Sequence, residues 1–286
     1  MQIPVTITFN HTVVCGMLAL LTPFVYADSV MTPRDPEAPW EGDPDISAIE
    51  DERIVELWED TMVEYRRNNP TGMSTRSIWG CEKYRAEPHA PEDQELLIDA
   101  LAEALEGEDP DWNYVRTVLL LMQRGMSNNP AIPRLAHHMF TLPRPVKMSN
   151  AHGSSFSAML RILSQQNTAE AAELLYDACS RDYWGDAPMH TPAYSRHYSE
   201  ISIRGVRVTA LAQLSRMSPD LSIPWLEKLA DAYPENYEPP TMEIKTGYRF
   251  TTTREVEIDF DPARIRRKLA AAYEALAEQE TTTRQE

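Results

Sequence analysis

The chain has 286 residues, of which 42% are hydrophobic and 25% charged, and this balance excludes an intrinsically disordered protein. Its formal net charge of -17 opposes binding to phosphate backbones and anionic lipid surfaces, so we expect no nucleic-acid partner. Only 10 glycines stand against 22 prolines, which favours helices separated by proline-containing corners. We therefore expect a mainly α fold.

The first 27 residues contain no Asp, Glu, Lys or Arg, and they predict a signal peptide. Val13 to Tyr26 form a continuous apolar run that is shorter than a membrane-spanning helix needs. Val25-Tyr26-Ala27 places small residues where signal peptidase reads them, so we expect cleavage before Asp28. The segment before the run has no basic residue, which departs from the usual export signal. We expect an exported protein, periplasmic or secreted, with no integral membrane segment after cleavage.

The rest of the chain divides by composition into a linker, a domain and a tail. Residues 28–45 are rich in proline and acid, with little to bury, and predict an extended linker. Residues 46–280 carry the apolar periodicity of a single α-helical, repeat-like domain, and residues 281–286 predict a disordered tail.

Apolar residues in that domain recur at three- and four-residue spacing, which predicts a succession of helices. The expected helices cover residues 54–65, 91–106, 111–124, 130–140, 154–166, 169–181, 201–217, 221–233 and the region from 262 onwards. Only Asn167 and Thr168 separate two of them, so these two should form an antiparallel helical hairpin. Alternating apolar and polar residues predict a small β-hairpin near 241–260, before the last helix.

Two stretches share a spacing that indicates a repeated helix pair. Val115-Arg116 is followed 17 residues later by Ile132-Pro133, and Val206-Arg207 is followed 17 residues later by Ile223-Pro224. A weaker intermediate copy aligns Leu160 with the first copy at a step of 40 residues and with the last at a step of 51. Two amphipathic helices in a hairpin cannot cover their own apolar faces, so such pairs are expected to stack.

The pattern V-R-x-x-A-L-x-x-L from Val206 to Leu214, followed after a turn by I-P-x-L, resembles the HEAT or HEAT-like repeat family. The resemblance implies a short, curved α-solenoid that is used mostly for binding. This chain departs from the family in having little of the aspartate ladder at the turns, and its copy from Ser154 lacks the Val-Arg pair. An irregular α-bundle whose helices share a spacing stays open as an alternative.

No motif in the chain predicts a cofactor or a metal site. The seven histidines include no H-E-x-x-H pair, and the cysteines lack zinc-site spacing. The chain also has no glycine-rich phosphate loop and no G-x-S-x-G nucleophile elbow. We therefore expect no cofactor and no metal.

Two long connections, 182–198 and 74–93, gather aromatic and histidine side chains and are the predicted binding surface. The candidate residues are Tyr183, Trp184, His190, Tyr194, His197 and Tyr198 around the first connection, and Trp79 and Tyr84 in the second. Cys81 and Cys179 lie in or beside these connections, and an oxidising compartment would allow them to pair. The alternatives are that these aromatics fill gaps between helix pairs and that both thiols are free and buried.

The sequence favours an exported, non-enzymatic binding or scaffold protein whose loops or concave face hold a protein or a cell-envelope component. The alternative is an exported glycan-active hydrolase with a Glu or Asp general acid in a helical cleft. A hydrolase would need a buried carboxyl group with a raised pKa facing a groove beside Tyr183, Trp184 or Tyr194.

Overall fold

The computed structural model describes residues 46, 49–68, 88–107, 110–142, 150–184, 195–246, 252–257 and 259–283. The chain divides into two compact units. The first comprises Met1–Asp43 and Met62–Gly80, and of it the structure describes only 62–68. The second comprises Pro44–Thr61 and Cys81–Glu286. It holds residues 52–61 of the first described helix and all the other helices and strands described below.

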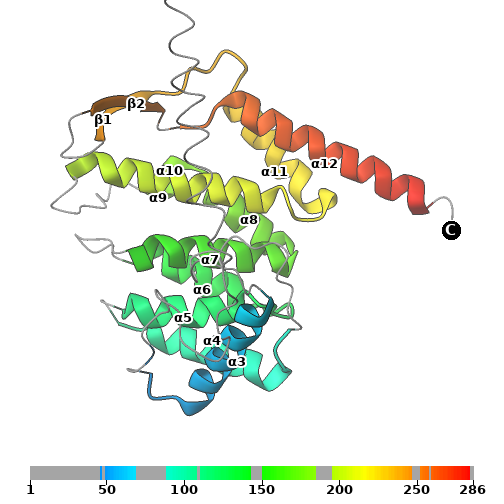
Figure 1. Cartoon of the computed structure of the whole chain (residues 1–286). Helices are drawn as coiled ribbons and strands as arrows, with labels where there is room; N and C mark the ends of the chain where they lie inside the picture. The colour runs from blue at the N-terminus through cyan, green and yellow to red at the C-terminus, as the bar shows by residue number, and fades with distance from the viewer. Residues whose placement is uncertain are drawn as a thin grey trace, which may run out of the picture. The chain divides into compact units, whose positions relative to one another are not determined.

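The described chain is mainly helical, as its composition predicts (Figure 1). Its helices are α3 (Glu52–Asn68), α4 (Pro91–Ala104), α5 (Trp112–Met122), α6 (Ala131–Thr141), α7 (Asn150–Gln166), α8 (Ala169–Asp177), α9 (Arg181–Trp184), α10 (Ser195–Leu214), α11 (Pro219–Ala232) and α12 (Pro262–Thr283). Helices α7 and α10 begin earlier than predicted, at Asn150 and Ser195. The helix predicted over 169–181 ends at Asp177, and the short α9 follows it.

Local signals explain where several helices begin. The Asp111 carboxylate accepts hydrogen bonds from the backbone N–H groups of Asn113 and Tyr114, and it thereby caps α5. The Thr168 hydroxyl accepts the N–H of Ala171 at 3.3 Å and caps α8 in the same way. Helices α4 and α11 each carry proline at the start of the first turn, where its missing N–H costs nothing.

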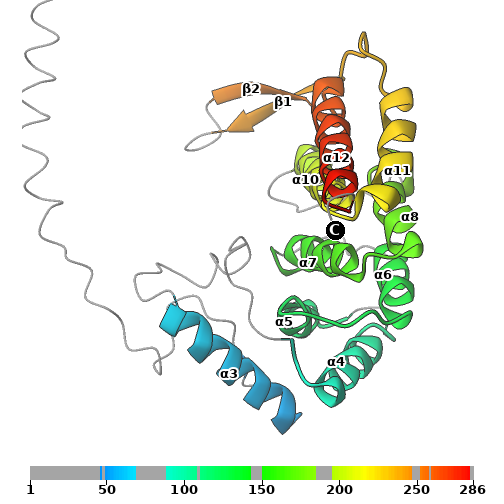
Figure 2. The same ribbon diagram turned by 90° about the vertical axis from the view of Figure 1, so that its right-hand side faces the viewer.

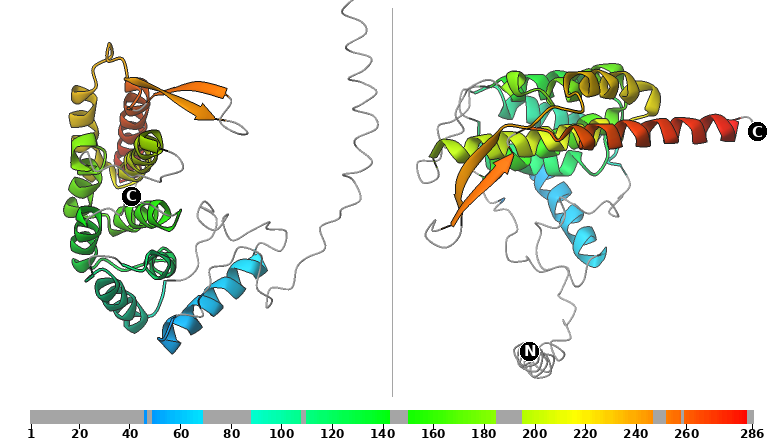
Figure 3. Two further views of the ribbon diagram at one scale, coloured as in Figure 1. Left: turned by 90° about the vertical axis from the view of Figure 1, so that its left-hand side faces the viewer. Right: turned by 90° about the horizontal axis from the view of Figure 1, so that it is seen from above.

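Two strands lie between α11 and α12. Strand β1 (Thr241–Thr246) pairs antiparallel with β2 (Thr252–Glu257), in a register that sets Thr241 opposite Glu257 and Thr246 opposite Thr252. Figure 3 shows this pair extending from the end of the second unit that carries α10 and α12. Residues 247–251 lie outside the described residues, so the turn of the predicted hairpin stays a prediction.

The helices of the second unit pack in two neighbouring rows (Figure 2). Helix α7 contacts both α5 and α10, and α8 contacts both α6 and α11. Contacts of α7 with α6 and α8 join the rows, and α12 packs on α11. Leu120, Leu160 and Leu211, which the predicted steps of 40 and 51 residues align, are all buried.

Three side-chain amides accept hydrogen bonds from the connections that lead into α6 and α11. Gln94 Oε1 accepts the N–H of Ser127 at 2.7 Å, and Gln166 Oε1 accepts the N–H of Asn129 at 2.8 Å. Asn167 Oδ1 accepts the N–H of Ser218 at 2.8 Å. Each bond satisfies a backbone N–H group of the connection that leads into α6 or α11.

One buried arginine joins the C-terminal elements to the rest of the second unit. The Arg207 side chain on α10 is 1% exposed, and its Nη2 donates to Asp259 Oδ1 at 2.6 Å and to the Tyr233 hydroxyl at 2.9 Å. Its Nε donates to the Cys179 carbonyl at 2.8 Å, and its guanidinium lies 4.7 Å from the ring centre of Phe260. Arg207 therefore links the end of α8 and the end of α11 to the segment that leads into α12.

The acidic partner in this network is held in its charged form. Burial alone would raise the pKa of Asp259, but the charge of Arg207 opposes it. Hydrogen bonds from Tyr237, from the Phe260 N–H and from Arg207 act in the same direction as that charge. Together they hold the pKa of Asp259 below its usual value.

We predict that Asp259→Asn lowers the free energy of unfolding by about 3 kcal/mol at pH 7, because it leaves the Arg207 charge buried without a counter-charge. Because the folded pKa of Asp259 is depressed, the stability that its ionisation contributes is present at neutral pH. It should be lost as the pH falls below about 4. Urea denaturation at pH 7 and pH 3 should therefore show a large difference between wild type and variant at pH 7 and a small one at pH 3.

The matched control is Asp231→Asn, an exposed position on α11 that removes the same charge. The double variant Arg207→Met/Asp259→Asn should recover part of the lost stability, because it removes both charges. Equal losses in Asp259→Asn and Asp231→Asn would contradict the stabilising role of the pair.

Candidate functional site

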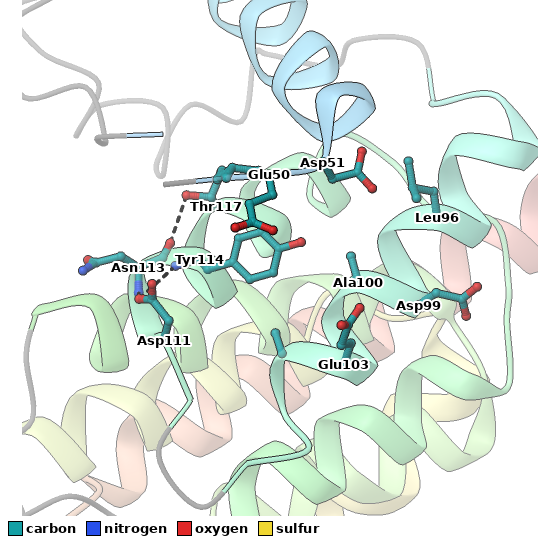
Figure 4. A pocket seen from close by; sticks show the side chains of 12 residues that line it. Glu50, Asp51, Leu96, Asp99, Ala100, Glu103, Asp111, Asn113, Tyr114 and Thr117 are labelled. Atoms are coloured by element: carbon teal, nitrogen blue, oxygen red, sulfur yellow. Dashed lines mark hydrogen bonds between the residues drawn. The ribbon is translucent and has the colours of Figure 1, made fainter. Parts of the chain in front are cut away.

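A pocket of about 500 Å³ lies in the second unit between residues 49–51, α4 and α5 (Figure 4). Every charged residue that lines it is an acid: Glu50, Asp51, Asp99, Glu103 and Asp111. Asp99 and Glu103 lie four residues apart, so they share one face of α4. The pocket is therefore suited to a positively charged group.

The acids of the pocket divide by their hydrogen bonding. Asp51 and Asp111 accept backbone N–H groups at the starts of α3 and α5, and they are committed to capping. The carboxylates of Glu50, Asp99 and Glu103 form no hydrogen bond or ion pair with the residues that the structure describes, and all three are exposed. These three are available to a ligand.

The remaining wall combines apolar carbon with one phenol. Leu96 and Ala100 of α4 line one side, and Tyr114 of α5 reaches into the pocket among the carboxylates (Figure 4). Burial, followed by the charges of Asp51 and Glu103, raises the pKa of Tyr114. The hydroxyl of Tyr114 is therefore neutral at physiological pH, and the face of its own ring can contact a cation.

An ion pair fixes one edge of this pocket. Arg53 of α3 donates through Nε and Nη2 to both carboxylate oxygens of Asp93 on α4, each at 2.9 Å. A hydrogen bond from Arg53 is the main cause that lowers the pKa of Asp93. This two-point contact holds the start of α3, and with it residues 49–51, against α4.

Of the predicted binding residues, Trp184 lies in the core. Its side chain is 2% exposed, its indole N–H donates to the Ala178 carbonyl at 2.9 Å, and its ring contacts Phe140 and Phe156. Tyr183 is partly exposed, and its hydroxyl lies 3.4 Å from His137 Nδ1. Trp184 therefore packs as a core residue, while Tyr183 faces the surface.

The other predicted residues cannot be compared with the pocket. Trp79, Cys81, Tyr84, His190 and Tyr194 lie outside the described residues. His197 and Tyr198 lie in the first turns of α10, but their side chains are outside what the structure describes. The role of the two predicted loops in binding stays a prediction.

One carboxyl group meets part of the criterion for a hydrolase. Burial, followed by the charge of Glu173, raises the pKa of Asp177, while Lys228 and His137 oppose the rise. His137, whose charge acts on Asp177, is also the residue that contacts Tyr183. It does not line the pocket described above. Asp177 is therefore not a candidate general acid for that pocket.

Cys179 forms no disulfide with a residue that the structure describes, and its side chain is fully buried. Its Sγ donates to the Leu175 carbonyl at 3.3 Å, and burial raises the pKa of the thiol. Because Cys81 lies outside the described residues, the pairing of these two cysteines stays a prediction.

The burial of Cys179 predicts an unreactive thiol in the folded chain. In the variant Cys15→Ser/Cys81→Ser, Cys179 should react with a thiol reagent at least about tenfold more slowly in buffer than in denaturant, because the thiolate is the reacting form. Absorbance of the released aromatic thiol measures both rates. Equal rates would show that Cys179 is accessible in the folded state.

The pocket was not predicted from the sequence, although the Asp99 and Glu103 spacing on one helix face was a usable signal. Among the described residues, no group of three or more His, Cys, Asp or Glu side chains could hold a metal ion, and no helix there is long and apolar enough to cross a membrane. Comparison with protein-family models, with curated proteins and with solved structures finds no match to this chain.

Proposed function

We propose that this chain is a non-enzymatic binding protein that holds a basic group of a partner protein in the acidic pocket. The observation that carries the proposal is the charge of the pocket lining, in which every charged residue is an acid. Three of these carboxylates have no partner among the described residues, so a lysine or arginine side chain would gain several charge-assisted hydrogen bonds there. The proposed partner is a basic segment of a protein or of a cell-envelope component.

The surroundings of the pocket favour a cation over a neutral ligand. The formal net charge of -17 creates a field that attracts basic partners and raises the rate at which they meet the chain. Tyr114 and the apolar carbon of α4 would contact the stem of a lysine or arginine while the carboxylates hold its charged end.

We further propose that the pairs α5–α6, α7–α8 and α10–α11 are three units of a short HEAT-like α-solenoid. The support comes from the contacts within each row and from the buried residues at steps of 40 and 51. The same steps relate His137 on α6, Asp177 at the end of α8 and Lys228 on α11, and the charges of His137 and Lys228 both act on Asp177. A stack of this kind would present the pocket on a rigid scaffold.

We also propose that the chain is exported. The support is the uncharged leader of 27 residues and its small residues before Asp28. Export would expose the pocket to extracellular or periplasmic partners.

We predict that Asp99→Asn/Glu103→Gln weakens the binding of a fluorescein-labelled octalysine peptide about three- to tenfold at low salt, because exposed ion pairs each contribute up to about 1 kcal/mol. Fluorescence anisotropy measures the dissociation constants. Binding of the wild type should weaken as salt is added, because salt screens the carboxylates.

The matched control is Glu274→Gln/Glu278→Gln on α12, which removes the same net charge from exposed positions outside the pocket. This control should bind the peptide nearly as well as the wild type. If both double variants weaken binding equally, only the overall charge attracts the peptide, and the pocket has no specific role.

If the chain is exported, signal peptidase should give the mature protein a defined N-terminus. Expressed with its leader in a Gram-negative host, the protein should be recovered from the periplasm with Asp28 as its first residue, as N-terminal sequencing would show. Leu20→Arg places a charge inside the apolar run and should keep the precursor in the cytoplasm. Recovery of both proteins in the cytoplasm with Met1 intact would refute export.

A further inference from the structure

A second site of opposite charge lies where α5 ends beside α7 and α10. Gln123 is the C-terminal cap of α5, and its Oε1 accepts a hydrogen bond from Arg161 Nη1 of α7 at 3.4 Å. Its Nε2 is buried and has no hydrogen-bond partner in the described part of the chain. A buried amide donor without an acceptor is uncommon in folded proteins and calls for an explanation.

Arg161, beside Gln123, also has N–H donors without an acceptor among the described residues. Its guanidinium is half-buried and makes no ion pair with any residue that the structure describes, and the bond to Gln123 uses one of its five N–H donors. Burial, followed by the positive charge of Arg216, lowers the pKa of Arg161. Two positive charges therefore act on each other here, inside a chain whose net charge is strongly negative.

Reorienting the Gln123 amide would not remove the deficit. Turning it would place its N–H groups against the Arg161 guanidinium, which has donors only. The neighbouring polar side chains are already paired. Ser164 donates to Gln213 Oε1 at 2.9 Å, and Gln165 donates to the Gln123 carbonyl at 3.1 Å. Gln123 Nε2 and the remaining donors of Arg161 therefore lack an acceptor among the described residues, and a negatively charged acceptor suits them best.

We propose that Gln123 and Arg161 form a binding site for a single oxyanion, a phosphate or a carboxylate group. A guanidinium offers parallel N–H donors that match two oxygens of such a group, and the buried Gln123 Nε2 supplies a third donor. The charge of the exposed Arg216, which acts on Arg161, adds to the positive charge around the site. This inference does not depend on the acidic pocket, because it rests on different residues and takes a ligand of opposite charge.

The test compares anions at equal ionic strength with the full chain. Inorganic phosphate should raise the melting temperature of the wild type above its value in chloride, and calorimetric titration should give its dissociation constant. Arg161→Met should weaken phosphate binding at least about tenfold, because it removes the charged fork. The control Arg267→Gln, an exposed arginine of α12, removes the same charge and should leave phosphate binding unchanged.

A second variant supplies the missing acceptor from the chain itself. Gln123→Glu should raise the melting temperature in chloride and abolish the further effect of phosphate, because its carboxylate would occupy the site. This result would distinguish the proposal even if Arg161→Met failed to fold. An acetate arm separates the two sources of the oxyanion: an effect equal to that of phosphate assigns the site to carboxylates, and a smaller effect assigns it to phosphate groups.

The proposal would be overturned if phosphate, acetate and chloride gave the same melting temperature for the wild type. It would also be overturned if Arg267→Gln weakened phosphate binding as much as Arg161→Met does. Neither result would bear on the acidic pocket, whose test uses a cationic peptide.

Discussion

The fold depends on one constraint: a pair of antiparallel helices has more apolar surface than the two helices can hide from each other. Helix α7 shows this most clearly, since Leu160 and Leu163 are both fully buried and the helix contacts α5 on one side and α10 on the other. Its core exists only because both neighbours are present. The order of the helices in space follows the order in the chain for the same reason.

This constraint requires that certain positions be buried, but it does not fix which side chain is buried there. The position of Arg207 in the last pair corresponds, at a step of 51 residues, to Phe156 in the middle pair. Phe156 is 2% exposed and packs among aromatic rings, whereas Arg207 at 1% exposed binds Asp259. The side chain of Phe156 thus fills space in the core, whereas the side chain of Arg207 anchors the segment that leads to α12.

Much of the fold could be predicted from the sequence, because helix periodicity, proline positions and caps are local signals. The apolar periodicity includes Leu120, Leu160 and Leu211, and all three are buried. The pairing of Arg207 with Asp259 could not be predicted, because 52 residues separate the partners and the Val-Arg pair suggested packing alone.

The candidate site was missed for a similar reason: residues 49–51, α4 and α5 each contribute a few acids, and no single stretch resembles a motif. Aromatic content singled out Trp184, whose ring proved to fill the core.

Helix α5 explains how sites of opposite charge can exist in one small region. Its N-terminal end carries Asp111 and Tyr114 toward the acidic pocket, and its C-terminal end carries Gln123 toward Arg161. The helix dipole favours acids at the first end and guanidinium groups at the second, so it contributes to the charge of both sites. A helix of 11 residues is about 16 Å long, roughly twice the screening length at physiological salt. A ligand at one end is therefore largely screened from a ligand at the other, and each site can select its own charge.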